Sequence, residues 1–205
     1  MLDHLVYATP DVETTAAALA ARLGVPATHG GRHPGRGTYN ALFGLGPGSY
    51  LEVIGPDPGQ PAPAGPRWFG IDSLAEPRLV TWAAKAAGLE HWVAAAALRG
   101  VRLGPVMARS RVRPDGKWLQ WQLTDPGKWI AGGIVPFFID WGDGSHPADD
   151  LPPGLELAEL RAEHPDAAQV ERMLVALGLD LPVRAGPQPG LIATLNGPHG
   201  RIELR

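Results

Sequence analysis

The chain of 205 residues contains no cysteine, which excludes disulfides, thiolate metal ligands and a cysteine nucleophile. Any metal ion would have to be held by histidine, aspartate or glutamate, which suit harder or imidazole-binding ions. Positive charge is not in excess either, because 18 Lys and Arg stand against 21 Asp and Glu, a formal net charge of −3. Such a chain lacks the charge for binding a polyphosphate backbone, so nucleic acid is not expected as a partner.

Long hydrophobic runs are also absent from the sequence. No window approaches the ~18 consecutive apolar residues of a membrane span, so no membrane partner is expected. Residues 1–7 are typical of a strand and show neither the basic nor the apolar region of a secretory signal, and we expect a cytoplasmic protein. Hydrophobic residues make up 44% of the chain and charged residues 19%, as in packed globular domains.

Glycine and proline are abundant, with 27 and 22 residues, and they predict many turns between short elements. A helix is predicted to begin within Thr9-Pro10-Asp11, where Thr9 is the capping residue, Pro10 occupies the first helical position and Asp11 is an acid in the first turn, and to end at Gly24. The first 55 residues then have the order β-α-β-β-β: a strand at 2–8, the helix, a short stretch near 25–28, a Gly-rich loop, and strands at 39–45 and 50–54.

The same order returns twice along the chain. Gly24, Gly100 and Gly178 end the three predicted helices at nearly equal spacing, which favours duplicated modules. The alternative is that short α/β units end in glycine by chance. The modules span residues 1–55, 78–141 and 155–205 and together would form one compact domain. The second contains strands at 78–84, 101–112, 118–124 and 134–139, a helix at 89–99 and a hairpin turn at Pro114-Asp115-Gly116; the third contains strands at 155–162, 191–195 and 201–204 and a helix from Pro165.

His4 and Glu52 are the first candidate site residues. His4 lies in the first predicted strand, and Glu52 lies in the last strand of the same module between Leu51 and Val53. A carboxylate in so apolar a strand is costly to bury unless it is paired or bound to a cation. Histidine and glutamate together make half of a divalent metal site. The alternative is a hydrogen-bonded core histidine and a glutamate that faces water.

On these residues the chain resembles a known superfamily. Residues 2–6, 9–11 and 50–55 are similar to the vicinal oxygen chelate proteins, which include glyoxalase I, extradiol dioxygenases and bleomycin-binding proteins. Residues 31–40, 66–70, 136–142 and 146–148 resemble the glyoxalase-like branch. The resemblance implies an α+β fold in which repeated βαβββ modules form a curved mixed sheet, a cupped half-barrel, with helices on its outer face and metal and substrate inside.

The resemblance also implies that His4 and Glu52 are metal ligands, with Glu52 catalytic as well. The second module departs from this pattern, because Thr81 stands opposite His4, and Phe137 or Phe138 stands opposite Glu52. The third module has a glutamate at both positions, although solvent-facing glutamates are also common in strands. Pairing of the first and third modules would give this ligand set: His4, Glu52, Glu159 and Glu203.

Strand alternation predicts which polar side chains line the cup. Asn40 lies opposite two apolar neighbours, and helices on the apolar face would leave it inside. By the same logic Trp118, Gln120 and Gln122 share one face. Buried amides are typical of pockets that fix a ligand's orientation. The alternative for these strand residues is a polar outer face of the sheet.

Charged residues supply the remaining candidates. Arg32 and Arg36, in a Gly-rich loop with His33, could hold a carboxylate or phosphate, or could lie in a solvated turn. Asp140 and His146 could form an acid–base pair. A row of arginines alternates onto one strand face and would suit an anionic ligand or form an exposed charged row: Arg109, Arg111 and Arg113.

Two functions follow from these residues. The leading hypothesis is a divalent-metal-dependent enzyme of isomerase or lyase type, in which His4 and Glu52 hold Mn, Fe, Ni or Zn as a Lewis acid towards a small oxygenated organic molecule. A dioxygenase would want two histidines and one carboxylate on one metal, and only one such histidine is identified. The alternative is a metal-free protein that sequesters a small molecule, as the bleomycin-binding relatives do; the seven tryptophans favour it. An odd number of modules could leave a sheet edge that pairs in a homodimer.

Overall fold

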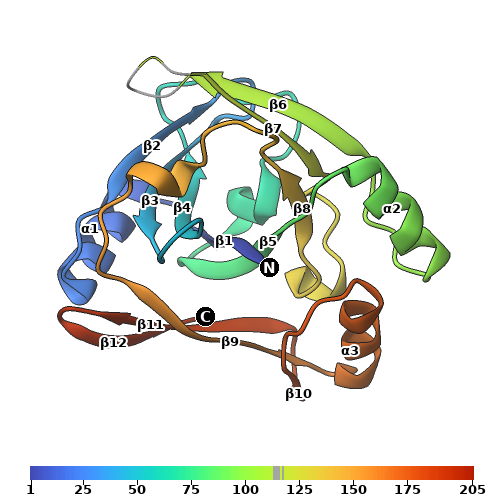
Figure 1. Cartoon of the computed structure of the whole chain (residues 1–205). Coiled ribbons are helices and arrows are strands. Elements are labelled where there is room, and N and C mark those ends of the chain that lie inside the picture. Colours follow the sequence, from blue (N-terminus) through green and yellow to red (C-terminus); the bar gives the residue numbers. More distant parts are fainter. Residues whose placement is uncertain (113–115, 117) are drawn as a thin grey trace.

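The computed structural model describes residues 1–112, 116 and 118–205, and within them twelve strands form two sheets (Figure 1). The larger sheet has the order β2-β3-β4-β1-β5-β8-β7-β6 and the smaller has the order β10-β9-β11-β12. In the described part of the chain, none of the helices combines the length and the apolar character that crossing a bilayer would need. The strands are β1 Leu2–Ala8, β2 Thr28–His33, β3 Thr38–Gly44, β4 Tyr50–Pro56, β5 Arg78–Lys85, β6 Val106–Val112, β7 Trp118–Thr124, β8 Phe137–Asp140, β9 Glu156–His164, β10 Val183–Ala185, β11 Gly190–Gly197 and β12 Gly200–Leu204; the α-helices are α1 Val12–Leu23, α2 Leu89–Leu98 and α3 Ala167–Ala176, and the short 3-10 helices are η1 Trp68–Ser73, η2 Ala131–Gly133 and η3 Pro147–Asp150.

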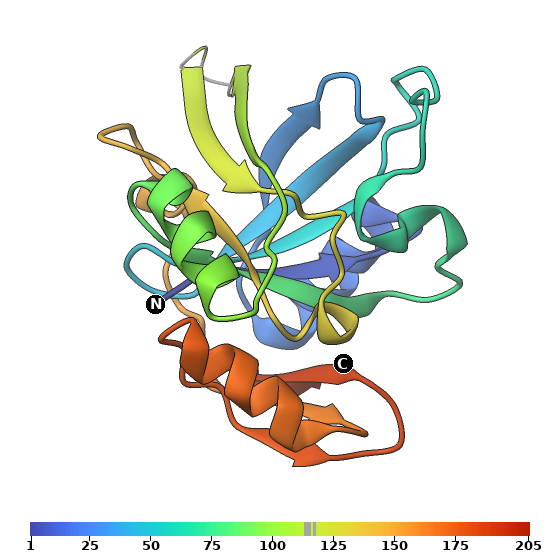
Figure 2. The ribbon, with the colours of Figure 1, turned by 90° about the vertical axis from the view of Figure 1, so that its right-hand side faces the viewer.

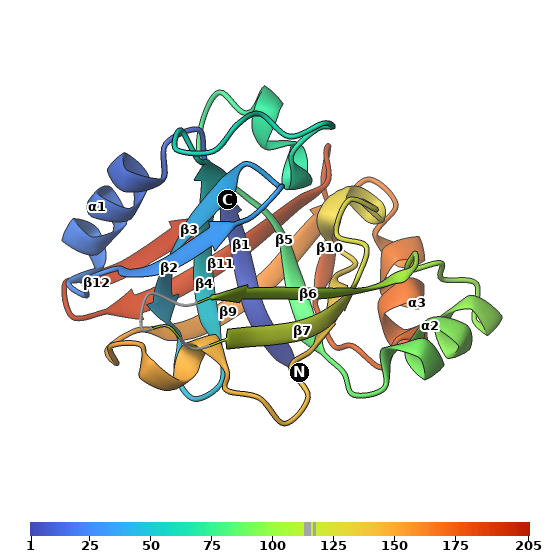
Figure 3. The ribbon, with the colours of Figure 1, turned by 90° about the horizontal axis from the view of Figure 1, so that it is seen from above.

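The eight-stranded sheet consists of two similar halves. The first half has the order β2-β3-β4-β1, the second has the order β6-β7-β8-β5 read from the other edge, and antiparallel pairing of β1 with β5 joins them. The sheet curls back so far that β6 and β7 cross over β1, β4 and β5 when seen from above (Figure 3). Helices α1 and α2 lie outside the curl at its two ends (Figure 1). The predicted curved mixed sheet with outer helices is confirmed.

Alternation along the strands places apolar side chains on both sides of this sheet. Leu5, Phe43 and Leu51 belong to the main core, which also takes in the helices and the smaller sheet. Val6 and Ile54 belong to a second apolar cluster inside the cup. Burying each such leucine or phenylalanine stabilises the fold by about 1.5–3 kcal/mol. Because the cup interior is largely apolar, its polar groups must find partners among themselves or in a ligand.

Helix α1 begins two residues later than predicted and ends at the predicted glycine. Asp11 caps the helix and accepts a hydrogen bond from the Thr14 backbone N–H at 3.0 Å. Gly24 ends it in the left-handed conformation with φ of 79°, which glycine adopts without a steric penalty. The buried side chains of Val12 and Leu19 lie on one face of the helix, and α1 packs with that face on β3 and β4.

The third predicted module has the expected order of elements but a different pairing. β9 lies between β10 and β11, whereas the first strands of the other two modules lie beside the last strand of their own module. This unit forms a separate sheet with α3, in a layer apart from the eight-stranded sheet (Figure 2). The expectation that the first and third modules form one cup is therefore wrong. The physical reason is that β5 already occupies the free edge of β1.

Three predicted segments have different bounds in the structure. β2 occupies the predicted Gly-rich loop, where Gly30 packs so closely on the side chain of Asn40 that no Cβ would fit. β6 begins at Val106 rather than at 101, because Gly104 takes a left-handed φ of 84° before Pro105. β8 begins at Phe137 rather than at 134, directly after a proline that cannot donate to the ladder. The first two residues of the predicted turn Pro114-Asp115-Gly116 lie outside the described residues.

Candidate functional site

The cup encloses a cavity of about 50 Å³ with polar walls from β1, β3 and β4. His4 on β1 and Glu52 on β4 line it and are only 3% and 7% exposed. β1 and β4 are parallel, and Val6 pairs with Glu52, so His4 lies on the same face two residues earlier. The distance from His4 Nε2 to Glu52 Oε2 is 3.7 Å. The structure thus brings together the two residues for which the sequence implied a metal.

Asp3 fixes the ring of His4. It is fully buried and its Oδ1 lies 2.7 Å from His4 Nδ1, while its Oδ2 lies 3.0 Å from His146 Nε2 and accepts from Trp141 Nε1 at 3.1 Å. The register of β1 with β5 shifts between Leu2 and His4, and such a bulge allows adjacent side chains to turn towards each other. Burial opposes ionisation, but the hydrogen bonds from His146 and His4 hold the pKa of Asp3 well below its usual range.

Asn40 fixes the carboxylate of Glu52. Its Nδ2 donates to Glu52 Oε1 at 2.5 Å, from the neighbouring strand β3. Its Oδ1 is buried and has no hydrogen-bond partner within the described part of the chain. A Cβ on Gly30 would lie only 2.2 Å from this oxygen. β2 therefore leaves space for the amide by having no side chain at that position.

His33 lies at the edge of the same cluster. Its Nδ1 is 3.0 Å from Thr38 Oγ1, and its Nε2 is 4.0 Å from Glu52 Oε1. Burial lowers the pKa of His33 to about 4, although the charge of Glu52 acts in the opposite direction. The imidazole is therefore neutral at pH 7, the form that can accept a hydrogen bond or bind a metal ion.

The chemistry of these donors fits part of a metal site. With Asp3 as the acceptor of the Nδ1 proton, the neutral form of His4 has the lone pair of Nε2 on the side of Glu52. A carboxylate behind a ligating histidine is the usual arrangement in metal centres. However, among the described residues no group of three or more His, Cys, Asp or Glu side chains is placed to hold a metal ion. His4 and Glu52 could hold an ion only with water or substrate in its other positions.

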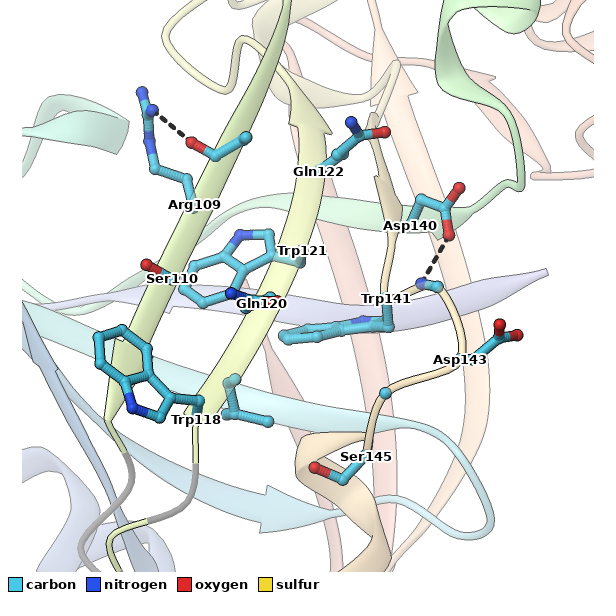
Figure 4. A pocket seen from close by; sticks show the side chains of 14 residues that line it. Arg109, Ser110, Trp118, Gln120, Trp121, Gln122, Asp140, Trp141, Asp143 and Ser145 are labelled. Atoms are coloured by element: carbon cyan, nitrogen blue, oxygen red, sulfur yellow. Dashed lines mark hydrogen bonds between the residues drawn. The ribbon is translucent and has the colours of Figure 1, made fainter.

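Four predicted ligand-binding residues line an open groove of about 810 Å³ rather than the cup: Trp118, Gln120, Gln122 and Asp140. Trp121 and Leu123 of β7 face the His4–Glu52 cavity, so by alternation the two glutamines point to the other face. The predicted alternation of β7 is correct, but the face predicted to line the cup faces the groove, and the opposite face lines the cup. Figure 4 shows the groove between β7 and the loop that follows β8, where the rings of Trp121 and Trp141 lie 5.3 Å apart.

Three other predicted charged or titratable residues have structural partners: Arg32, Asp140 and His146. Arg32 is largely exposed and its Nε pairs with Asp57 Oδ2 at 3.1 Å, away from the cavity lining. Asp140 accepts hydrogen bonds from the backbone N–H of Gly142 at 2.8 Å and from that of Gly88, before α2, at 3.0 Å. His146 bonds with Asp3 instead, so the expected pair of Asp140 and His146 is not formed.

Glu159 and Glu203 lie on the smaller sheet, outside the cup. Arg161 has its Nε 3.6 Å from Glu159 Oε2, and its Nη2 donates to Glu203 Oε2 at 2.9 Å. Both carboxylates are exposed, and an arginine between them supplies the positive charge. The hypothetical set of one histidine and three carboxylates that included them is therefore wrong, because their sheet does not reach His4 or Glu52.

Sequence reasoning missed the roles of Asp3 and of two aromatic rings around the cavity. Tyr50 stacks on His4 with 4.6 Å between ring centres, and Phe137 contacts the same imidazole edge-on at 5.6 Å. Arg111, which the sequence placed in a row of arginines, is buried, and its Nη1 donates to the Gly30 carbonyl, which links β6 to β2; Arg113 of the same row lies outside the described residues. The signal for Asp3 was present, since a carboxylate directly before a buried histidine can orient its ring.

Comparison with known proteins identifies a family that matches this chain. Residues 2–178 match the family model described as a glyoxalase-like domain. No curated protein matches the chain. A solved structure of a hypothetical protein from Staphylococcus aureus is 14% identical and covers 98% of this chain and 83% of that chain with a TM-score of 0.65, so the two share the fold.

Two further solved structures are similar over a smaller part. A hypothetical protein from Bacillus halodurans is 17% identical over 71% of this chain and 97% of that chain, with a TM-score of 0.48. Methylmalonyl-CoA epimerase from Mycobacterium tuberculosis is 18% identical over 67% of this chain and 85% of that chain, with a TM-score of 0.45.

Proposed function

The chain belongs to the glyoxalase-like domain family, and on that premise we propose that it is a divalent-metal-dependent enzyme acting on a small oxygenated organic molecule. One observation carries the proposal. A histidine and a glutamate lie 3.7 Å apart inside an apolar cup, and each is oriented by a buried partner, Asp3 for His4 and Asn40 for Glu52. Proteins bury such polar clusters only when the groups are satisfied or bind something.

The proposed cofactor is Mn, Fe, Ni or Zn. Imidazole and carboxylate donors suit all four ions, and His4 and Glu52 would hold the ion through Nε2 and Oε2. When bound, a divalent ion supplies Lewis acidity that stabilises an oxyanion on the substrate. With only two protein ligands, positions remain for two adjacent oxygens of a substrate.

The protein's own groups then favour proton transfer. Asp3 keeps the lone pair of His4 Nε2 facing the cavity, and Asn40 holds Glu52 through Oε1. Glu52 is the proposed catalytic base that takes a proton from substrate carbon. The apolar side chains of the cup exclude water from that step. These roles fit an isomerase or lyase; a dioxygenase would want two histidines and a carboxylate on one metal, and the described residues contain no three-ligand group.

The test is the metal content of tag-free protein, measured by elemental mass spectrometry before and after incubation with the four ions. Near one equivalent is expected in the wild type, with a loss of at least tenfold in affinity for Glu52→Gln. The matched control is Glu159→Gln, another strand glutamate, which is exposed and paired with Arg161; it should bind metal like the wild type. Equal metal content in Glu52→Gln and wild type would contradict the proposal.

A second candidate function is metal-free binding of a small molecule. It is favoured by the absence of a three-ligand group among the described side chains and by the tryptophan-lined groove beside the cup. In that case the wild type retains no metal, and its melting temperature is unchanged by divalent ions but raised by a ligand. The expected homodimer also stays a prediction, which mass measurement in solution tests.

A further inference from the structure

A second cavity, of about 200 Å³, adjoins the one at His4 and Glu52. Both cavities have His33, Trp68, Arg111 and Trp121 in their walls, so they share part of their lining. We call the second space the arginine cavity. Of the residues described around it none is acidic, and its charged and aromatic lining is Arg36, Arg109, Arg111, His33, Trp68 and Trp121.

Arg36 and Arg109 reach this cavity from different parts of the sheet. Arg36 follows β2, and its guanidinium carbon lies 4.5 Å from the centre of a Trp68 ring, which holds the cation in place. Arg109 lies on β6 and donates to the Ala108 carbonyl at 2.8 Å and to Met107 Sδ at 3.1 Å. In the described part of the chain its Nε is buried without a hydrogen-bond partner.

The two arginines line the same cavity, so their like charges act on each other. Burial is the largest cause that lowers the pKa of Arg109, the positive charge of Arg36 lowers it further, and the charge of Asp125, which is not part of the cavity lining, acts in the opposite direction. Among the described residues neither arginine forms an ion pair with a carboxylate, in contrast to Arg32, which pairs with Asp57. Two like charges beside one cavity, with an unused donor on one of them, are stabilised when an anion lies between them.

We propose that the arginine cavity binds the carboxylate of the substrate, whose oxygenated end reaches His4 and Glu52. Planar guanidinium groups bind carboxylates through paired hydrogen bonds. The indole rings of Trp68 and Trp121 give the carbon part of the ligand an apolar wall. The substrate class is therefore a small carboxylic acid, aromatic or planar next to its carboxylate. That the oxygenated end of the substrate reaches His4 and Glu52 rests on the proposed function; the anion site itself does not.

Benzoate and benzamide test the anion site, because they share size and shape and differ in charge. Tryptophan fluorescence titration and thermal shift measure binding of each to the full-length protein. We expect benzoate to bind the wild type at least tenfold more tightly than benzamide. Arg36→Gln and Arg109→Gln should each lose that preference. Arg99→Gln removes the same charge from an exposed position at the end of α2 and should keep it.

Glu52→Gln separates this proposal from the proposed function. It removes a proposed metal ligand and leaves the arginine cavity lining intact, so benzoate binding should persist even where metal binding is lost. Wild-type protein that retains no metal but prefers benzoate tenfold would support the anion site and contradict the metal enzyme. Equal affinity for benzoate and benzamide would overturn the anion site, and so would an Arg99→Gln effect as large as that of Arg109→Gln.

Discussion

Replacing Asp3 with asparagine is expected to move the proton on His4 while leaving every proposed ligand in place. Asp3 is fully buried and bonds with ring nitrogens of His4, His146 and Trp141. Asparagine keeps one acceptor oxygen, which can serve His146 and Trp141, and places an NH₂ group beside His4 Nδ1. Two N–H donors would then face each other. The imidazole should shift its proton to Nε2, which removes the lone pair that faces Glu52.

The expected loss of stability follows from these hydrogen bonds. A hydrogen bond to a charged group contributes about 1.5–3 kcal/mol and a neutral one about 0.5–1.5 kcal/mol. Asp3→Asn removes one charged bond and converts two others into neutral ones, while it also avoids burying a charge. We expect the free energy of unfolding at pH 7 to fall by about 2–4 kcal/mol. In a chain of this size that lowers the melting temperature by about 4–16 °C.

Three measurements follow Asp3→Asn: urea unfolding, metal content, and nitrogen NMR of the His4 imidazole, which reports the protonated nitrogen. Asp57→Asn is the matched control, because Asp57 is also buried but pairs with Arg32 outside the cavity. It should lose stability and keep both the His4 proton on Nδ1 and the metal. Wild-type metal content in Asp3→Asn, with the proton still on Nδ1, would refute the reasoning. So would an equal loss of metal in Asp57→Asn.

Two further predictions concern the same cluster. In metal-free protein, the pKa of His33 in the folded state, about 4, lies below its ordinary value of 6.5. The free energy of unfolding should therefore be highest above pH 6.5 and fall by roughly 3 kcal/mol as the pH decreases to 4. Urea unfolding across this range should show a weaker pH dependence in His33→Gln. Gly30→Ala would place a Cβ 2.2 Å from Asn40 Oδ1, which should cost ~1–3 kcal/mol and weaken metal binding through Glu52. Gly65→Ala, with nothing within 4 Å of its Cβ, should change neither quantity, and metal binding by Gly30→Ala equal to wild type would contradict the role of Asn40.

The first half of the cup could be predicted because its signals are local. The signals at Thr9-Pro10-Asp11 predicted the start of the helix to within two residues, the glycine at position 24 predicted its end, and period-two alternation predicted the faces of the strands beside it. The same alternation brought Asn40, His4 and Glu52 into one cavity. Each of these inferences needed only the residues next to it in the sequence and the rule that helices cover the apolar face of a sheet.

Other features depend on contacts between distant segments. The partners of Asp3 stand 138 and 143 positions later, and no local pattern in either segment indicates the other. Alternation of β7 separates Gln120 from Trp121, but it does not say which face the curl of the sheet turns inward. The third unit has the same order of elements as the first, but the pairing of strands determines which sheet they join. The edge of β1 is paired with β5, so the strands of the third unit form a separate sheet.

The second half of the cup, β5 to β8, supplies no candidate ligand but supports the ligands of the first half. Thr81 stands where His4 has its counterpart, and its hydroxyl donates to the Gly133 carbonyl at 2.9 Å, so it serves the backbone. Phe137 packs on the His4 ring. Trp141 and His146, in the segment that follows β8, hold the Asp3 carboxylate that orients the same ring. The first half of the cup therefore supplies both candidate ligands, and the second half fixes the ring of one of them, His4. For this reason we expect changes in either half to affect metal binding.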